Sequence, residues 1–318
     1  MSSKTKRIFA IVGAVLVSVL VFAVLARVVF IPLSQYNSAL KLMENGEYAK
    51  AVIAFKDLGD YKDSKEKVNE CKYAAAMENI ESGDYIAGYE ALIALGNYND
   101  CAKQASAIFE KYKVQKLKFA QKGDIVYFGT YEQDNNTENG AENIEWLVLD
   151  VVDGQALVVS KYALDAVSFH TENVSVSWEK SALRKWLIGD FLDSAFSEKE
   201  LTAIPISSVE ADYNEIYETT SGNSTNDKLF LLSVDEAKKY FAADEDRQCT
   251  ATEYAVQKGV EVTEENNNCW WWLRTTGAFD YYASYVFSDG EVLAHGGRVA
   301  NGYIAARPAM WIDLSLVQ

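Results

Sequence analysis

The stretch IFAIVGAVLVSVLVFAVLA occupies residues 8–26 and contains no charged side chain. Apart from Arg27, the apolar character continues to Ile31. As a helix with a rise of ~1.5 Å per residue, this segment would be about 36 Å long, whereas a hydrocarbon core is ~30 Å thick. The stretch therefore predicts a single transmembrane anchor over residues 8–31. A cleaved signal peptide is the alternative, but its apolar region should be only ~7–15 residues long and end in a small-residue site, which residues 23–26 match poorly.

The short segment before the anchor is basic. Lys4, Lys6 and Arg7 lie within residues 1–7, and no acidic residue accompanies them. The positive-inside rule keeps such a tail in the cytoplasm. We therefore expect a single-pass protein of the cell membrane, with residues 1–7 cytoplasmic and the C-terminal bulk extracytoplasmic.

The rest of the chain is strongly acidic. The first 31 residues hold four of the 30 basic residues and no acid, so residues 32–318 carry 26 basic and 46 acidic residues, a formal charge of −20. Binding to nucleic acid requires a basic surface that neutralises phosphates. The charge therefore excludes nucleic acid as the natural partner.

Residues 43–68 recur at residues 80–105 with an offset of 37. Both copies contain a Gly-acid-Tyr turn and a Leu-Gly-x-Tyr-x-Asp turn, and glycine supplies the left-handed residue that ends many helices. Period and turns resemble tetratricopeptide-type helical repeats, most clearly in GEYAKA at residues 46–51. We expect a short all-α repeat region over residues 34–119. It would serve either as a spacer or as a groove for a protein partner, since two units are fewer than the roughly three of a stable solenoid.

From Gly123 onward the pattern changes to short β-rich segments, then short helices, then strands again. The expected strands are residues 124–128, 144–152, 155–160, 270–274, 285–287, 292–294 and 304–312. Asp153-Gly154 predicts a type I′ hairpin turn. Capping-box patterns at residues 197–200, 233–236 and 250–253 predict helix starts. This order predicts a compact α+β domain over residues 123–318.

Two segments near the C-terminus are specific enough to suggest a relationship. CWWWLR at residues 269–274 and RPAMWI at residues 307–312 resemble an uncharacterised bacterial domain family with a W-W-L-R stretch and a closing R-P-A-x-W-I. Further matching segments extend this resemblance over residues 123–314: IEWLVL at 144–149, SKYAL at 160–164, LRKWL at 183–187 and LLSVDE at 231–236. More distantly, the layout is similar to the C-type-lectin-like fold as elaborated in the formylglycine-generating enzyme family. This second resemblance implies a lectin-like α+β domain.

The sequence offers little evidence for an enzyme. Formylglycine-generating enzymes use two closely spaced cysteines as a copper site, but Cys249 and Cys269 are twenty residues apart, so that motif does not match. These two cysteines could instead close a loop as a disulfide. His170 and His295 have no nucleophile motif beside them. We therefore expect neither a catalytic site nor a metal or cofactor, and an enzyme related to formylglycine generation is the remote alternative.

Aromatic residues are the remaining candidates for recognition. One group lies within eighteen residues and includes Trp270, Trp271, Trp272, Tyr281, Tyr282, Tyr285 and Phe287. Successive side chains on a strand point to opposite faces, so at least one face of the tryptophan run must be core. The tryptophans expected to form the aromatic core are Trp146, Trp186, Trp271 and Trp311. The residues expected to contact a ligand are Asp280, Tyr281, Tyr282 and Arg298, in or near a polar loop.

The most favoured function is a membrane-anchored extracytoplasmic binding or sensing protein, whose ligand is a glycan, a cell-wall fragment or a peptide. The alternative is a scaffold that recruits a partner through its helical repeats. An exposed aromatic patch in the 275–303 loops would favour the first function, and exposed groove residues on the repeats would favour the second.

Overall fold

The computed structural model describes residues 2–318 and divides the chain into two compact units, Met1–Tyr112 and Lys113–Gln318. Met1, the first residue of the expected cytoplasmic tail, lies outside the described residues.

The first unit begins with a long apolar helix. α1 (Ser3–Leu25) continues through one π-helical turn, η1 (Ala26–Phe30), into α2 (Ile31–Glu44). The continuous helix Ser3–Glu44 is 42 residues long, and none of its most apolar stretch is buried. By length and composition it can cross a membrane, in agreement with the expected anchor.

The helices that follow recur in pairs. They are α3 (Tyr48–Leu58), α4 (Ser64–Ser82), α5 (Tyr85–Leu95) and α6 (Cys101–Lys118). The starts of α3 and α5, and of α4 and α6, are each separated by the 37 residues of the sequence offset. α3 ends at Gly59 and α5 at Gly96, and both glycines have a positive φ. The recurrence seen in the sequence therefore corresponds to a recurrence of helix boundaries.

The same tyrosine–aspartate hydrogen bond occurs in both copies of the repeat. The Tyr36 hydroxyl donates to Asp63 at 2.5 Å, and the Tyr73 hydroxyl donates to Asp100 at 2.6 Å. In both pairs the donor and the acceptor are 27 residues apart. The two bonds join α2 to the N-terminal end of α4, and α4 to the N-terminal end of α6, so the recurring tyrosine and aspartate have the same structural role in both copies.

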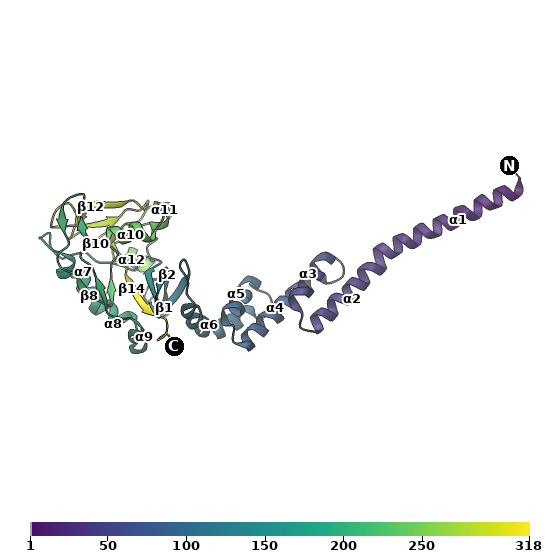
Figure 1. Ribbon diagram of the computed structural model, residues 1–318, viewed down its shortest axis with the longest axis horizontal. Coiled ribbons are helices and arrows are strands. Elements are labelled where there is room, and N and C mark those ends of the chain that lie inside the picture. Colours follow the sequence, from purple (N-terminus) through teal and green to yellow (C-terminus); the bar gives the residue numbers. More distant parts are fainter. Residues whose placement is uncertain (1) are drawn as a thin grey trace. The chain divides into compact units, whose positions relative to one another are not determined.

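The second unit contains two five-stranded sheets with short helices between them in sequence (Figure 1). The first sheet has the order β1-β2-β3-β14-β9, with strands Ile125–Tyr131, Glu142–Val152, Gln155–Ser160, Ala309–Asp313 and Leu229–Phe230. The second has the order β12-β11-β10-β13-β4, with strands Val292–Arg298, Tyr282–Val286, Trp271–Thr276, Ala305–Ala306 and Asp165–Ala166. Thus β14, at the C-terminal end of the chain, pairs with β3 from the start of the unit.

Two further strand pairs and a set of short helices complete this unit. The pairs are β5 (Ser207–Val209) with β8 (Thr225–Asp227), and β6 (Tyr213–Asn214) with β7 (Thr219–Thr220). The helical segments are η2 (Trp178–Lys180), α7 (Ala182–Trp186), η3 (Leu187–Phe191), α8 (Leu192–Ala195), α9 (Glu198–Ala203), α10 (Val234–Tyr240), α11 (Asp244–Arg247) and α12 (Glu253–Lys258). The chain is therefore α+β, as expected.

Local signals in the sequence correspond to turns and caps. Asp153 and Gly154 both have positive φ, as a type I′ hairpin turn between β2 and β3 requires. The capping boxes begun by Ser197 and Ser233 are present. The prediction of a third capping box at residues 250–253 was wrong, because α12 begins at Glu253 with Thr252 as its cap.

The third box fails because its first residues belong to β-type pairing. Thr250 forms an antiparallel bridge with Asn268, and Ala251 forms a parallel bridge with Ala163. A residue in extended pairing does not start a helix, so the helix begins two residues later. The expected strand over 304–312 is likewise divided at Arg307 and Pro308 into β13 and β14.

The tryptophans occupy one continuous core. Trp146 and Trp271 are fully buried, whereas Trp186 and Trp311 are partly buried and pack against the same core. Trp272 is also fully buried, so β10 is covered on both faces. A strand buried on both faces positions the loops at its ends rigidly.

Candidate functional site

Five rings form a connected cluster on the surface of the second unit, here called the aromatic surface cluster: Tyr217, Phe279, Tyr281, Tyr282 and His295. The Phe279 and Tyr281 rings are stacked, with centroids 5.5 Å apart and planes 15° apart. His295 lies 5.5 Å from both Tyr217 and Tyr282, edge to face. Phe279 is 48% exposed and Tyr217 is 39% exposed. Large exposed apolar patches mark sites of interaction, so this cluster is the candidate site.

The cluster is assembled from three separate segments. Tyr217 lies in the turn between β6 and β7. Phe279 and Tyr281 lie in the turn between β10 and β11, Tyr282 begins β11, and His295 lies in β12. The rings therefore depend on the pairing of β10, β11 and β12 and on the docking of the β6–β7 segment.

Glycine at position 277 allows these segments to approach closely. A Cβ on Gly277 would lie 2.4 Å from the His295 carbonyl oxygen and 2.8 Å from the Tyr282 Cβ. The backbone there is tied on both sides, because the Gly277 N–H donates to the Tyr282 carbonyl and the Ala278 N–H to the His295 carbonyl, both at 2.8 Å. The loop conformation that presents Phe279 and Tyr281 is thus fixed by backbone hydrogen bonds.

Side chains of the β6–β7 segment bind to the same backbone. Asn214 is buried, and its amide donates to the Thr276 carbonyl at 2.9 Å and to the Ala294 carbonyl at 2.8 Å. The Thr219 hydroxyl donates to the Gly277 carbonyl at 2.7 Å. These bonds hold Tyr217 beside His295.

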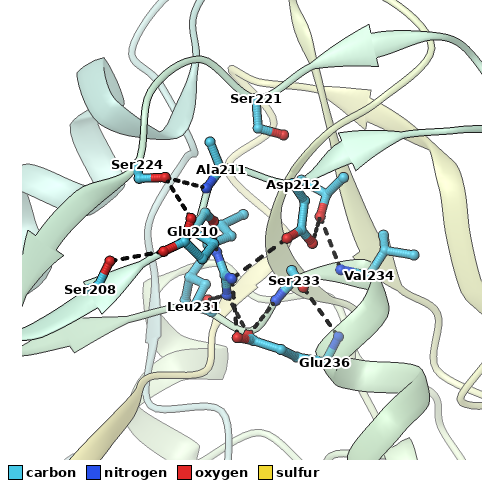
Figure 2. A network of polar contacts seen from close by, with 12 residues as sticks. Ser208, Glu210, Ala211, Asp212, Ser221, Ser224, Leu231, Ser233, Val234 and Glu236 are labelled. Carbon is cyan, nitrogen blue, oxygen red and sulfur yellow. Dashed lines mark hydrogen bonds and ion pairs between the residues drawn. The ribbon is translucent and has the colours of Figure 1, made fainter.

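A network of polar contacts surrounds Arg274 and the segment before β6 (Figure 2). Arg274, on β10, pairs with the Glu236 carboxylate through two guanidinium nitrogens, and its Nη2 lies 3.8 Å from Asp212. The same guanidinium donates to the Glu210 carbonyl at 3.2 Å and to the Leu231 carbonyl at 2.8 Å. The network therefore joins the segment before β6 to β10 and to the start of α10.

Asp212 is a partly buried carboxylate of this network. Burial raises the pKa of Asp212, and nearby Glu236 raises it further, although Ser233, Arg274 and Thr275 oppose the shift. Asp212 lines a recess of about 100 Å³ whose other walls include Asp235, Lys238 and Ile216. The recess adjoins the aromatic surface cluster along the chain, because Ile216 precedes Tyr217.

The expected ligand-binding residues fall in two groups. Tyr281 and Tyr282 belong to the aromatic surface cluster and are half-buried, whereas Asp280 and Arg298 are exposed beside it. Arg298 lies opposite Tyr282 in the pairing of β11 and β12. Sequence reasoning missed Tyr217, Phe279 and His295 as members of one cluster.

One group of described side chains has metal-ligand geometry. The carboxylates of Glu132, Asp134 and Glu142 lie within 4.8 Å of one another. Each already accepts backbone hydrogen bonds that shape the loop, for example from Gln133 to Glu142 at 2.8 Å and from Asn136 to Asp134 at 2.8 Å. Their arrangement is accounted for by the loop itself.

The two cysteines expected to pair lie side by side. Cys249 and Cys269 are both thiols in the structure and both buried. The Cys269 N–H donates to the Cys249 carbonyl at 2.8 Å. The disulfide itself stays a prediction.

The helical unit has a groove of its own. A cavity of about 470 Å³ is lined by small and apolar residues of three helices: Tyr48, Ala49, Val52, Cys71, Lys72, Ala75, Ala91, Ala94 and Leu95. Its lining comes from α3, α4 and α5 and therefore from both copies of the repeat.

Comparison with known proteins gives one result. No curated protein and no solved structure matches the chain. The model of a domain family of unknown function, DUF6273, matches residues 153–314, which is just over half of the chain. The matched residues include CWWWLR, RPAMWI and the whole aromatic surface cluster. The chain therefore belongs to the DUF6273 family of domains of unknown function.

Proposed function

We propose that this protein is a membrane-anchored extracytoplasmic binding or sensing protein, and that its C-terminal domain binds a glycan-containing cell-wall fragment through the aromatic surface cluster. The observation that carries the proposal is the stacked pair of exposed Phe279 and half-buried Tyr281 on a loop that follows the buried strand β10. Loops on a rigid scaffold are where recognition residues concentrate.

The chemistry of the cluster fits a ligand with both apolar and polar faces. Aromatic rings offer flat apolar surface with a polar rim. Asp280 and Arg298 are exposed beside the rings and supply a carboxylate and a guanidinium for hydroxyl, amide or carboxylate groups. A sugar that bears peptide or carboxylate substituents presents both kinds of surface.

We extend the proposal to the fold and the orientation of the chain. A C-type-lectin-like fold is supported by the pairing of β14 with β3, which brings the ends of the domain together and leaves a second sheet to carry the loops. An outward-facing domain is supported by the basic residues before α1. Protease added to intact cells should then remove residues beyond the anchor, and a protected C-terminal domain would contradict this orientation.

Binding should be measured with the full-length protein in detergent and with soluble peptidoglycan fragments released by a muramidase. Phe279→Ala and Tyr281→Ala should each weaken binding about tenfold or more, because truncation of a central aromatic contact costs ≥ ~1–2 kcal/mol. Both variants should keep the wild-type unfolding transition, since the two rings lie on the surface.

A matched control removes an exposed aromatic ring elsewhere. Phe119 is 67% exposed and lies outside the cluster, so Phe119→Ala should leave binding unchanged. Equal losses in Phe119→Ala and Phe279→Ala would argue against a site at the cluster. Binding by wild type to a glycan array but not to the peptidoglycan fragments would redirect the ligand class while keeping the site.

A second function, recruitment of a protein partner, is favoured by the groove between α3, α4 and α5. Its lining includes four alanines, which let a peptide backbone approach closely, together with the apolar side chains of Val52 and Leu95. An apolar peptide segment is the occupant that fits. Ala75→Trp would fill the groove, so it should abolish partner recruitment in a pull-down and leave fragment binding intact.

A further inference from the structure

Cys249 and Cys269 occupy directly opposed positions of a short antiparallel ladder. Thr250 and Asn268 form the bridge, and the Ala251 N–H donates to the Asn267 carbonyl on its far side. Directly opposed residues place their side chains on the same face. Opposed residues that share a backbone hydrogen bond have Cα atoms about 5.5 Å apart, within the ~4.4–6.8 Å range of disulfides.

The two thiols contact each other and little else that is polar. They form a side-chain hydrogen bond with each other. The Cys269 thiol also lies 3.3 Å from the Cys249 carbonyl oxygen, and the Cys249 sulfur lies 3.6 Å from the Lys161 carbonyl oxygen. Neither sulfur is exposed.

The guanidinium of Arg307 is a buried cation that interacts with both cysteines. Arg307 is 2% exposed, and it donates to the Ser160 carbonyl at 3.0 Å and to the Arg247 carbonyl at 3.2 Å. Its guanidinium carbon lies 4.7 Å from the centre of the Trp271 ring. Within residues 2–318, no carboxylate forms an ion pair with Arg307. A guanidinium stays charged when buried, so an anion nearby is strongly favoured.

The thiol of Cys249 is the group that can supply that anion. Burial raises the pKa of Cys249, but the hydrogen bond from Cys269 and the charge of Arg307 outweigh burial and lower the pKa to about 7. The hydrogen bond to Cys249 raises the pKa of Cys269 well above its usual value, and burial raises it further. Ionisation of the pair is therefore favoured at Cys249 rather than at Cys269.

We propose that Cys249 and Cys269 form a redox-responsive dithiol–disulfide pair whose reduced state is stabilised by the guanidinium of Arg307. Oxidation proceeds by exchange with an external low-molecular-weight disulfide. The Cys249 thiolate attacks one sulfur of that disulfide and expels one thiolate. Cys269 then attacks the Cys249 sulfur of the mixed disulfide and expels the second sulfur, which leaves with the Cys269 proton. The external disulfide gains the two electrons that the cysteines lose.

The position of Arg307 makes this pair unlike an inert structural disulfide. Oxidation removes the thiolate that interacts with the buried guanidinium of Arg307, so it costs interaction energy that the reduced state keeps. Stabilisation of the thiolate makes a disulfide more readily reduced. Because both sulfurs are buried, exchange also requires local opening of the chain between the two cysteines.

The test uses the full-length protein equilibrated in glutathione buffers of varied ratio, quenched with acid, alkylated and mapped by peptide mass spectrometry. The expected result is a Cys249–Cys269 bond that is reversible across the series. Reduction releases the proton of Cys249 only above its pKa. The equilibrium should therefore shift toward the dithiol about tenfold when pH rises from ~6 to ~8. The proposal would be overturned if the Cys249–Cys269 bond formed at none of the glutathione ratios. It would also be overturned if the equilibrium between dithiol and disulfide did not change with pH.

Variants of Arg307 separate its charge from its packing. Arg307→Gln should shift the equilibrium toward the disulfide about tenfold at ~pH 8 and remove the pH dependence, because each pKa unit of Cys249 corresponds to a factor of ten. Arg307→Lys keeps the charge and should restore most of the wild-type behaviour. An equilibrium in Arg307→Gln equal to that of wild type contradicts the role of the cation. If Arg307→Gln does not fold, the pH dependence of the wild-type equilibrium decides alone.

Discussion

The two units of this chain differ in how far apart in sequence their core residues lie. The helical unit has two separate clusters, one between Tyr36 and Cys71 and one between Ala76 and Ile108. The C-terminal domain has one core that draws on residues from Leu117 to Val317. Damage to a local cluster should stay local, whereas damage to the single core should reach every element of the domain.

The largest effect is expected from Trp271→Ala. The Trp271 ring is fully buried, and the guanidinium carbon of Arg307 lies 4.7 Å from its centre. Its removal should cost the C-terminal domain about 4 kcal/mol, since aromatic-to-alanine truncations in cores cost ~3–5 kcal/mol. Denaturant unfolding followed by tryptophan fluorescence measures the loss.

Trp311→Ala is the matched comparison, because Trp311 packs on the same core but is only partly buried. Its cost should be clearly smaller than that of Trp271→Ala. Equal losses of unfolding free energy would show that the degree of burial does not determine how much each of these two rings contributes to stability.

A smaller and confined effect is expected from Leu92→Ala. Leu92 is buried in the second cluster of the helical unit. The substitution should cost about 3 kcal/mol, in the usual range of ~2–5 kcal/mol for buried leucine, and hydrogen exchange should accelerate in residues 76–108. Unchanged exchange in residues 36–71 would support two separate clusters. Equal acceleration in both would show that the helical unit opens as one body.

The smallest effect is expected from the tyrosine–aspartate bonds. The hydrogen bond from Tyr36 lowers the pKa of Asp63, and the bond from Tyr73 lowers the pKa of Asp100. A lowered carboxylate pKa stabilises the fold above the ordinary value of 3.8, and this stabilisation is lost as pH falls through the folded pKa. The same bond raises the pKa of Tyr73 to about 12, so its contribution is also lost as pH rises through that value. Tyr36→Phe with Tyr73→Phe should flatten the acid dependence of melting of the helical unit.

Asp212, in the C-terminal domain, should change stability with pH in the opposite direction. Its pKa is raised, first by burial, so the folded state holds the proton more tightly than the unfolded state. Its contribution to stability is present below 3.8 and is lost as pH rises through the raised pKa. Asp212→Asn should therefore stabilise the domain more at neutral than at acidic pH, as thermal unfolding at two pH values would show. A gain that is larger at acidic pH would contradict the assigned sign.

Much of the local structure could be predicted from the sequence. The uncharged run predicted the long apolar helix, and Asp153-Gly154 predicted the hairpin turn, because both signals act over neighbouring residues. The third capping box failed because residues 250 and 251 pair with segments distant in sequence. A local pattern carries no information about such partners.

The site was only partly predictable for the same reason. Tyr281 and Tyr282 stood out as a pair in a polar loop, and Phe279, two residues away, could have been added from its place in that loop. Tyr217 and His295 could not have been assigned to the cluster from the sequence, because they reach it only through the docking of β6–β7 and the pairing of β11 with β12. The side-chain hydrogen bonds of Asn214 that hold this docking leave no sequence pattern.

The most direct test of the proposed function compares the two units in a single measurement. Hydrogen–deuterium exchange of the full-length protein is followed with and without soluble peptidoglycan fragments. Binding at the aromatic surface cluster should slow exchange in residues 213–220, 277–283 and 292–298 and leave exchange in residues 48–95 unchanged. Slower exchange confined to residues 48–95 would contradict it and assign ligand recognition to the helical groove.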